Sequence, residues 1–332
     1  SMPDNAIQLL LNEWLLAVFN PQKRIFWGYL LSSLFIAILW LRLIQKINIQ
    51  SSFIKIFNRN VWGSASAFAD YKVMFINALL MTLLSPRILA KATVAYLIFD
   101  SLHLLFEGRP SVLTGIPQWT IALSFTFFLF ILDDFARYWL HRWLHTIPLL
   151  WSFHKVHHSA STLNPFTVFR THPAEAILFS VRSAMVQGIS TAVFFFFFGN
   201  QVTLVMVLGA SIFTFAFNLL GSNLRHSPVS ISYWHPIELI LMSPAQHHIH
   251  HSTAEEHIDR NFGVALSVWD WIFGTLCHSK AGEQLNYGLS GTKLTNPHTL
   301  KSLYFDPIQE AGRTLLHFVH QLNLPFQREN SA

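Results

Sequence analysis

The chain has few charged residues for its length. Only 12% of its 332 residues are Asp, Glu, Lys or Arg, whereas 52% are hydrophobic. A soluble domain carries about 25% charged residues, and an ionised side chain is costly in hydrocarbon. The deficit therefore favours an integral membrane protein.

Cysteine is nearly absent as well. Cys277 stands alone, which excludes an internal disulfide, a Cys-type zinc site and a Cys-ligated iron–sulfur cluster. No G-x-G-x-x-G dinucleotide fingerprint follows a strand pattern, and the H-E-x-x-H zinc-protease spacing is missing. The net charge of +5 forms no basic stripe with interleaved aromatics, so nucleic acid is not an expected partner.

Long apolar runs predict membrane-spanning helices, each of which needs about 20 residues. The predicted fold is an all-α integral membrane protein with about five transmembrane helices and a cytoplasmic helical cap. The predicted spans are Ile25–Ile44, Ile88–Phe106, Gln118–Leu140, Ala174–Phe198 and Gln201–Leu220. The shorter stretch Tyr71–Leu84 ends before Pro86. At 1.5 Å per residue it covers about 21 Å of a hydrocarbon core about 30 Å thick, which indicates a re-entrant or interfacial segment.

The placement of basic residues predicts the orientation. Lysines and arginines gather between residues 45 and 87, so this segment should be cytoplasmic. Residues 141–173 and 221–332 should lie on the same side. We divide the chain into an N-terminal membrane region (1–117), a histidine-box catalytic region (118–278) and a C-terminal cytoplasmic tail (279–332) with a helix over Pro307–Leu322. The expected location is the bacterial inner membrane or, in a eukaryote, the endoplasmic reticulum.

Histidines cluster in three windows of five residues. HRWLH spans 141–145, HKVHH spans 154–158 and HHIHH spans 247–251, and together they hold nine of the 18 histidines. Helix positions i, i+3 and i+4 share a face, and His248 falls off the face of its box. The eight histidines on box faces are His141, His145, His154, His157, His158, His247, His250 and His251.

Metal binding explains these histidines better than packing does. A buried polar group without a partner costs about 1–3 kcal/mol, and a metal ion removes that cost by using the nitrogen lone pairs. One ion accepts about four to six ligands, so eight histidines favour two ions. Imidazole suits zinc, copper, iron and nickel, so the residue type does not name the metal.

Asp134 and Tyr138 lie on the same helical stripe as His141 and His145. Asp134 has two interpretations, which the residues leave open. It can accept an N–H from a ligating histidine and fix its ring, or it can form a helix-end ion pair with Arg137.

The boxes also resemble a known family. HRWLH, then HKVHH nine residues on, then SPAQHHIHHS followed by DRNFGVALSVWDWIFGT are similar to the fatty acid hydroxylase / sterol desaturase superfamily, from about Asp133 to Thr275. The resemblance implies a membrane helical bundle whose cap holds two metal ions. It also implies oxygen-dependent hydroxylation or desaturation of a lipid such as a fatty-acyl chain or a sterol.

The resemblance further implies a ligand set. It makes the eight box-face histidines ligands, and His226 matches an additional ligand between the second and third boxes. Some relatives carry a histidine where this chain has Gly221, so a tenth ligand stays open among Asn223, His172 and water. We expect His172 to be a supporting or interface residue at the start of a helix, and Asp270 to cap or pack the cytoplasmic cap.

The chemistry of the implied reaction selects iron. An unactivated C–H bond needs a redox-active cofactor, and zinc has no redox chemistry, although zinc can occupy the site in purified protein. Two iron ions are therefore the expected cofactor and a membrane lipid the expected substrate. The alternatives are a dizinc membrane lipid hydrolase and a histidine-rich metal or electron carrier.

The reaction needs electrons that this chain has no motif to collect. We expect a separate donor, a ferredoxin or a cytochrome b5-like protein with its reductase. An acidic carrier would dock faster on a basic face. The basic residues nearest the boxes in sequence are Arg137, Arg142, Lys155, Arg170, Arg225 and Arg260.

Overall fold

The described part of the chain is helical. The computed structural model describes residues 16–84, 91–106, 113, 115–199, 212–280, 282–289 and 294–323. Within these ranges no strand is formed, and two isolated bridges join Leu241 to Leu266 and Ser252 to Tyr287. The all-α class predicted from the sequence is confirmed.

The helices that form the long projecting arm and its base are α5 (Ala65–Leu84), α6 (Lys91–Leu105), α7 (Gln118–Thr146), α8 (Pro148–His158) and α9 (Pro173–Phe198). The remaining helices and short 3-10 turns are α2 (Trp27–Leu43), α3 (Ile49–Ile56), α4 (Arg59–Trp62), η2 (Pro165–Phe169), α11 (Ile212–Leu219), η4 (Ser222–Arg225), α12 (His235–Glu238), α13 (Pro244–His250), η5 (Glu255–His257), α14 (Val268–Ile272) and α15 (Leu300–Asn323).

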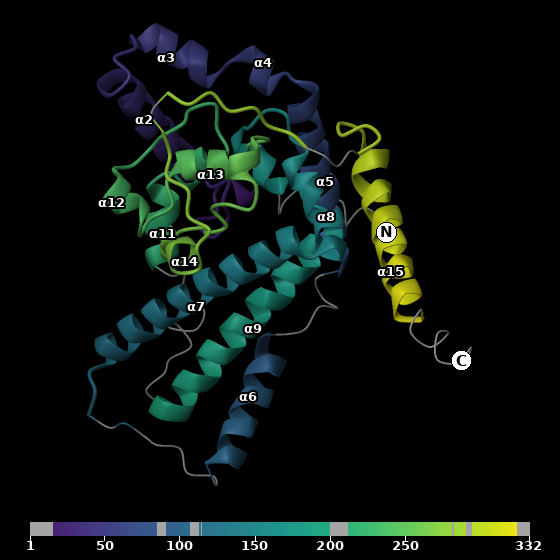
Figure 1. Ribbon diagram of the computed structural model, residues 1–332. Coiled ribbons are helices and arrows are strands. Elements are labelled where there is room, and N and C mark those ends of the chain that lie inside the picture. The colour runs from purple at the N-terminus through teal and green to yellow at the C-terminus, as the bar shows by residue number, and fades with distance from the viewer. Residues whose placement is uncertain are drawn as a thin grey trace, which may run out of the picture.

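Two described helices, α7 and α9, are long and apolar enough to cross a membrane. Together with α6 they extend away from the compact part of the molecule (Figure 1). In its most apolar stretch, only 17% of α7 is buried inside the protein, and side chains such as Leu123 and Phe127 are exposed. Exposed apolar side chains on a long helix are what a lipid environment stabilises, so these two helices support a membrane protein.

The other predicted spans are described only in part. The helix predicted over Ile25–Ile44 is α2, with 17 residues, and that over Ile88–Phe106 is α6, with 15. Of the stretch Gln201–Leu220, only Ile212 onward lies within the described residues. The number of five spans therefore stays a prediction.

The stretch Tyr71–Leu84 belongs to a longer helix than we predicted. Helix α5 starts at Ala65 and has 20 residues, or about 30 Å at 1.5 Å per residue. The sequence pattern missed its first two turns because they carry small and polar residues, Ser66 and Asp70 among them. These two side chains are buried against the histidine-bearing part, so the start of α5 belongs to the compact region.

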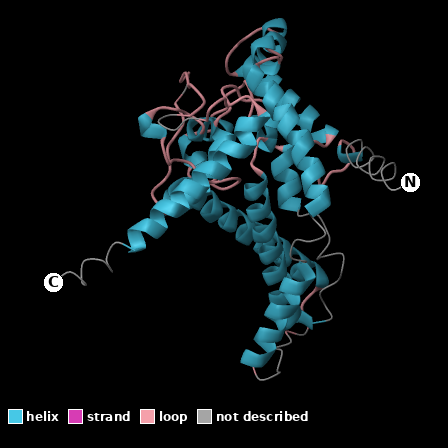
Figure 2. Cartoon of the chain, turned by 90° about the vertical axis from the view of Figure 1, so that its right-hand side faces the viewer, coloured by secondary structure: helices cyan, strands magenta, loops and turns pink. Residues whose placement is uncertain are grey.

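The C-terminal helix packs on the histidine region. Helix α15 begins seven residues before the predicted Pro307, and it lies beside α5 and α8 (Figure 1). Leu303 shares a core with Val156 of α8 and Val73 of α5, and Lys155 pairs with Glu310. In Figure 2, loops gather in the compact part, while the long helices project from it.

Candidate metal centre

Each of the three histidine boxes lies at the C-terminal end of a helix. His141 and His145 lie in the last two turns of α7, and a turn at Ile147 leads into α8, which has Pro148 in its first turn. Helix α13 starts with a capping box, in which the Ser243 and Gln246 side chains accept hydrogen bonds from each other's backbone N–H. Such caps satisfy N–H groups that the helix leaves unpaired.

All nine predicted ligands come together in two groups, within each of which one nitrogen per residue lies within 4.8 Å of the others. Cluster A contains His141, His145, His154, His158 and His250. Cluster B contains His157, His226, His247 and His251.

The boxes do not each serve one group. We predicted a common face for His154, His157 and His158, but His157 belongs to cluster B and its two neighbours to cluster A. The third box is divided too, with His250 in cluster A. A helical face is about 100° wide, so residues at i+3 and i+4 can reach different points in front of it.

Cluster B has the geometry of a metal site. The Nε2 atom of His226 lies 3.0 Å from Nε2 of His247, 3.1 Å from that of His251 and 3.3 Å from that of His157. One proton satisfies only one of these contacts. Nitrogens about 2.1 Å from a shared metal ion would lie about 3.0–3.4 Å apart, so the residues fit an ion.

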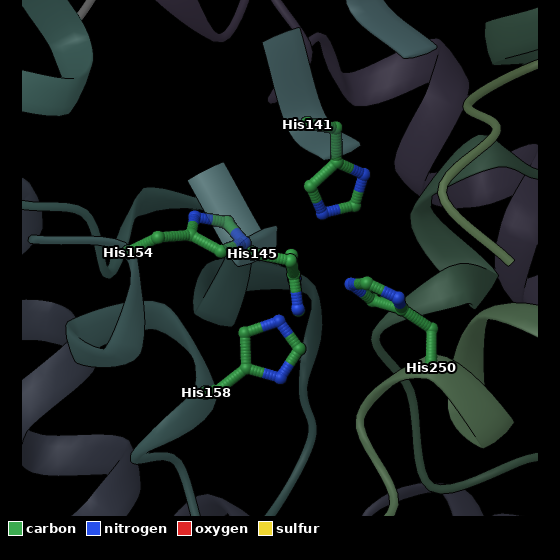
Figure 3. Close-up of side chains that lie close together, drawn as sticks. All are labelled: His141, His145, His154, His158 and His250. Atoms are coloured by element: carbon green, nitrogen blue, oxygen red, sulfur yellow. The ribbon is translucent and has the colours of Figure 1, made fainter. Parts of the chain in front are cut away.

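Cluster A surrounds a common space. Figure 3 shows its five rings, drawn from three helices, arranged around one centre. The Nε2 atoms of His145, His154, His158 and His250 are buried and have no hydrogen-bond partner within the described part of the chain. Buried nitrogens of this kind are costly unless a ligand uses their lone pairs, so cluster A also fits a metal ion.

Backbone carbonyls orient three of the rings. Nδ1 of His141 donates to the Phe262 carbonyl at 2.7 Å, and Nδ1 of His250 donates to the Arg260 carbonyl at 2.8 Å. Nδ1 of His157 donates to the Arg170 carbonyl at 3.3 Å. Because a carbonyl only accepts, the proton is on Nδ1 and the Nε2 lone pair faces the cluster, as in metal-ligating histidines.

Carboxylates lie behind two more rings, one of them closely. Oε1 of Glu175, in the first turn of α9, lies 3.0 Å from Nδ1 of His154, and Oδ1 of Asp259 lies 3.6 Å from Nδ1 of His145. Our sequence reasoning did not identify Glu175. The sequence nevertheless offers a signal for it, because Glu175 is a carboxylate two residues after Pro173 in the first turn of an apolar helix, where a charge needs a partner.

Both interpretations of Asp134 are wrong. Its carboxylate accepts from the N–H groups of Ala265 and Leu266 and from the Trp269 indole at 2.9–3.0 Å. Arg137 pairs instead with Asp133, at 2.7 Å. Asp134 therefore holds residues 265–269, which follow the third box in sequence, against α7. The spacing of residues along α7 could not predict this role, because the partners come from a distant segment.

Asp270 has the packing role we predicted. Its carboxylate accepts from the backbone N–H groups of Phe262 and Gly263 at 2.8 and 2.7 Å and from the Thr275 hydroxyl at 2.6 Å. A Cβ on Gly263 would lie 2.4 Å from the Leu266 carbonyl oxygen, so only glycine fits. The NFG turn is thereby fixed, and it presents the Phe262 carbonyl to His141.

The candidates for a tenth ligand have other partners. Asn223 accepts from Arg24 Nε at 3.1 Å and donates to the Arg24 carbonyl at 3.2 Å, so its proposed role beside a metal is wrong. His172 caps α9 through Nδ1, and its Nε2 donates to the Tyr304 carbonyl at 3.1 Å, which agrees with the expected interface role. Gly221 has φ +97°, a conformation that side chains rarely adopt.

His248 and His278 lie outside both clusters, as we predicted for the off-face residue. His248 is buried and faces the Tyr287 ring, 6.1 Å away. His278 joins His235 and Glu238 in a third group. The Glu238 oxygens already accept from Ser243, Ser279 and His278, so this group has a structural explanation.

Burial keeps the cluster imidazoles neutral. It lowers the pKa of His154 to about 3. Burial, together with repulsion from neighbouring imidazoles, lowers the pKa of His158 and of His251 well below the ordinary value. Neutral imidazole is the form that binds metal.

The predicted basic docking face is wrong in part, because half of its members are buried. Arg170 is fully buried and paired with Asp70, Lys155 is paired with Glu310, and Arg225 is 4% exposed. Within the described chain, only Arg137, Arg142 and Arg260 of the six keep part of their surface exposed. Half of the basic residues close to the boxes in sequence therefore make contacts inside the protein and are not available to a docking partner.

The region that bears the two histidine clusters is similar to a known protein family. The family model described as "Fatty acid hydroxylase" matches residues 126–275, which contain both clusters. These residues belong to the fatty acid hydroxylase family. No solved structure matches the chain.

Three relatives illustrate the similarity. Alkylglycerol monooxygenase from Homo sapiens is 31% identical over 159 residues, covering 47% of this chain and 31% of its own length. The Danio rerio alkylglycerol monooxygenase is 29% identical over 195 residues, covering 58% and 36%. Very-long-chain aldehyde decarbonylase GL1-8 from Oryza sativa subsp. indica is 32% identical over 175 residues, covering 51% and 58%. The chain thus matches about a third of the alkylglycerol monooxygenases and over half of the decarbonylase.

Proposed function

We propose that this fatty acid hydroxylase family member is a membrane-bound di-iron oxidoreductase that hydroxylates, or desaturates, a C–H bond of a membrane lipid with molecular oxygen. The observation that carries the proposal is the sorting of nine histidines, eight of them buried and His145 partly buried, into two adjoining groups, each large enough to hold one ion. The names of the relatives, a monooxygenase acting on alkylglycerols and a decarbonylase acting on long-chain aldehydes, support a lipid substrate.

The residues assign roles to the protein in this reaction. Cluster A and cluster B would each hold one iron, and the pair would supply the redox chemistry with oxygen that no side chain provides. Carbonyls behind the rings of His141, His157 and His250 direct the Nε2 lone pairs of these three residues towards the clusters. Trp151 and Phe262 pack against His145, both with ring centres 5.1 Å away, and keep water from that side of cluster A.

Metal analysis tests the dinuclear part. After anaerobic loading with ferrous iron, the purified chain should hold close to two irons, and a cluster A variant such as His154→Ala should hold about one or fewer. A single tightly bound ion at saturation in the wild-type chain would overturn the dinuclear site. Zinc in a purified sample does not decide the matter, because zinc binds more tightly than ferrous iron.

Turnover tests the reaction class. The iron-loaded chain, supplied with oxygen, reductant and in separate reactions an alkylglycerol, a fatty acid or a long-chain aldehyde, should form an oxidised product with at least one of them. Activity that persists without oxygen would favour the dizinc hydrolase. Metal binding without any turnover would favour a carrier.

The electron supply is a separate element of the proposal. We propose a ferredoxin or a cytochrome b5-like protein with its reductase as the donor. Reconstitution with NADPH should give turnover only when such a pair is added, and full turnover without any carrier would contradict it.

The orientation is proposed with both clusters on the cytoplasmic side, in a bacterial inner membrane or in the endoplasmic reticulum. Lys55 in α3 is exposed, so a cysteine there can be labelled. In a Cys277→Ser background, Lys55→Cys should react with a membrane-impermeant maleimide only after the membrane is opened. Labelling from the outside of sealed cells would contradict the orientation.

A further inference from the structure

An apolar pocket of about 230 Å³ adjoins the candidate metal centre. It lies between α7, α11, η4 and the segments 241–244 and 265–266. Most of its walls are apolar, with Phe130 from α7 and Phe213 and Phe217 from α11. Its polar side chains come from Ser222, Arg225 and Tyr233.

Arg225 is a buried cation without an ion-pair partner among the described residues. Its side chain donates to the carbonyls of Ser222 at 3.3 Å and Val264 at 3.0 Å, and its guanidinium lies 5.2 Å from the centre of the Phe217 ring. In the part of the chain that the structure describes, no carboxylate oxygen lies within 4.0 Å of it. Asp134 is in electrostatic range, but three N–H donors already occupy its oxygens. Buried charges are normally paired.

A second cation meets the same carbonyl. Nη2 of Arg24 donates to the Ser222 carbonyl at 2.8 Å, and its Nε donates to Asn223. Among the described residues, Arg24 has no carboxylate partner either. Two guanidinium groups directed at one carbonyl repel each other, and an anion bound beside them would stabilise both.

The pocket is close to the clusters along three elements. Arg225 directly precedes His226, and Pro244 lies one helical turn before His247. On α7, Phe130 precedes His141 by three turns, or about 16 Å at 1.5 Å per residue. The lining of the pocket therefore comes from three elements that continue into segments bearing the proposed metal ligands.

We propose that this pocket binds a single-chain lipid with an anionic head. The alkyl chain lies against Phe130, Phe213 and Phe217, and the carboxylate or phosphate of the head pairs with Arg225. That such a lipid is the substrate rests on the proposed function, whereas its binding does not.

Photolabelling tests the position of the chain. The full-length protein in nanodiscs is irradiated with a fatty acid that carries a diazirine in its chain, and adducts are mapped by mass spectrometry. Ala216 lines the pocket, so Ala216→Trp should fill it and lower labelling there at least tenfold. Leu219→Trp is the matched control, because Leu219 of α11 is exposed and does not line the pocket. Equal pocket labelling in Ala216→Trp and wild type would overturn the proposal.

Competition tests the head group without a substitution at Arg225. A fatty acid and a lysophosphatidic acid of the same chain length should suppress labelling at concentrations at least tenfold lower than the matching fatty alcohol does. The more effective of the two acids identifies carboxylate or phosphate as the natural head. Equal competition by the alcohol would overturn the anionic head.

The labelling needs neither oxygen nor electrons, so it separates this inference from the proposed function. A labelled pocket in a chain that binds two irons but oxidises no lipid leaves the pocket assignment standing and removes the enzyme. If the pocket is unlabelled in wild type and Ala216→Trp oxidises lipid at the wild-type rate, the pocket assignment is wrong and the proposed enzyme stands.

Discussion

The carboxylate of Glu175 lies 3.0 Å from Nδ1 of His154, and only 3% of either side chain is exposed. The contact joins the first turn of α9 to α8, and so connects a helix that can span the membrane to the second histidine box. A carboxylate behind a ligating histidine fixes the ring orientation and raises the basicity of the other nitrogen.

We predict that Glu175→Ala lowers metal affinity by about 10- to 100-fold, the usual effect of losing such a partner. Glu175→Gln should retain most of the affinity, because its amide oxygen can still lie next to Nδ1 of His154. Asp259→Ala is the control, since Asp259 is 51% exposed and 3.6 Å from His145, and it should change the affinity less than about threefold. Competition with a chelator measures all three. Equal losses in Glu175→Ala and Asp259→Ala would contradict the positioning role.

The cluster histidines should be separable from their neighbours. His157→Ala, His158→Ala, His250→Ala and His251→Ala should each abolish activity and lower the metal content. His248→Ala and His278→Ala should keep both, because these two side chains lie outside the clusters. Metal content and far-ultraviolet circular dichroism are measured on each variant. A folded His248→Ala chain without metal would show that its ring takes part in the site.

The buried pair Asp70–Arg170 should be important for stability. Its atoms are 2.9 Å apart and neither side chain is exposed, and the Arg170 carbonyl orients His157. Asp70→Ala leaves a buried unpaired guanidinium, so it should lower the free energy of unfolding by about 3–5 kcal/mol. Lys280→Ala, which removes the exposed pair with Glu283, should cost less than about 1 kcal/mol. Denaturant unfolding of the solubilised chain compares the two, and similar losses would rule out the structural role of the buried pair.

The metal-free protein should lose stability in acid. Burial lowers the pKa of His154 to about 3, and that of His158 and His251 well below 6.5. In the unfolded chain these histidines take up protons near pH 6.5. Above pH 6.5 these histidines are neutral in both states, so protonation does not favour the unfolded chain. As the pH falls from 6.5 towards 3, the free energy of unfolding decreases by about 1.4 kcal/mol per pH unit for each histidine.

Unfolding of chelator-treated protein between pH 7 and pH 4 measures this loss. His154→Asn should show a shallower pH dependence than wild type, because one proton fewer is taken up on unfolding. A stability independent of pH over this range would contradict neutral, buried imidazoles.

The sequence predicted which histidines come together but not how they divide. Spacing at i, i+3 and i+4 selected the box histidines and set His248 aside, and the family resemblance added His226. The separation of His157 from His158 depends on where α13 and η4 lie, which is set by contacts between segments far apart in the sequence. Local periodicity carries no such information.

The supporting residues were the hardest to predict. Asp134 follows the helical stripe of His141, yet it binds the segment 265–269, while the role expected of it falls to Glu175 from another helix. Carbonyl groups such as those of Phe262 and Arg260 have no sequence signature at all. Arg170 and Arg225 look like surface charges in the sequence and are buried in the fold. The contacts of Arg170 with Asp70 and of Arg225 with Val264 join segments that are distant in the sequence.

Each cluster combines histidines from at least one of the first two boxes with one or more from the third box. Neither metal site can therefore form until the third box has been synthesised. Cluster A needs His250 and cluster B needs His247 and His251, so neither is complete before residue 250 has left the ribosome. Chains emerge from the N-terminus at about 5–20 residues per second. Helices α7 and α9 are made many seconds before the third box and can enter the membrane without metal. Under the proposed function, iron would therefore reach a chain that is already inserted, and a cell short of iron would accumulate an inserted, metal-free protein rather than an unmade one.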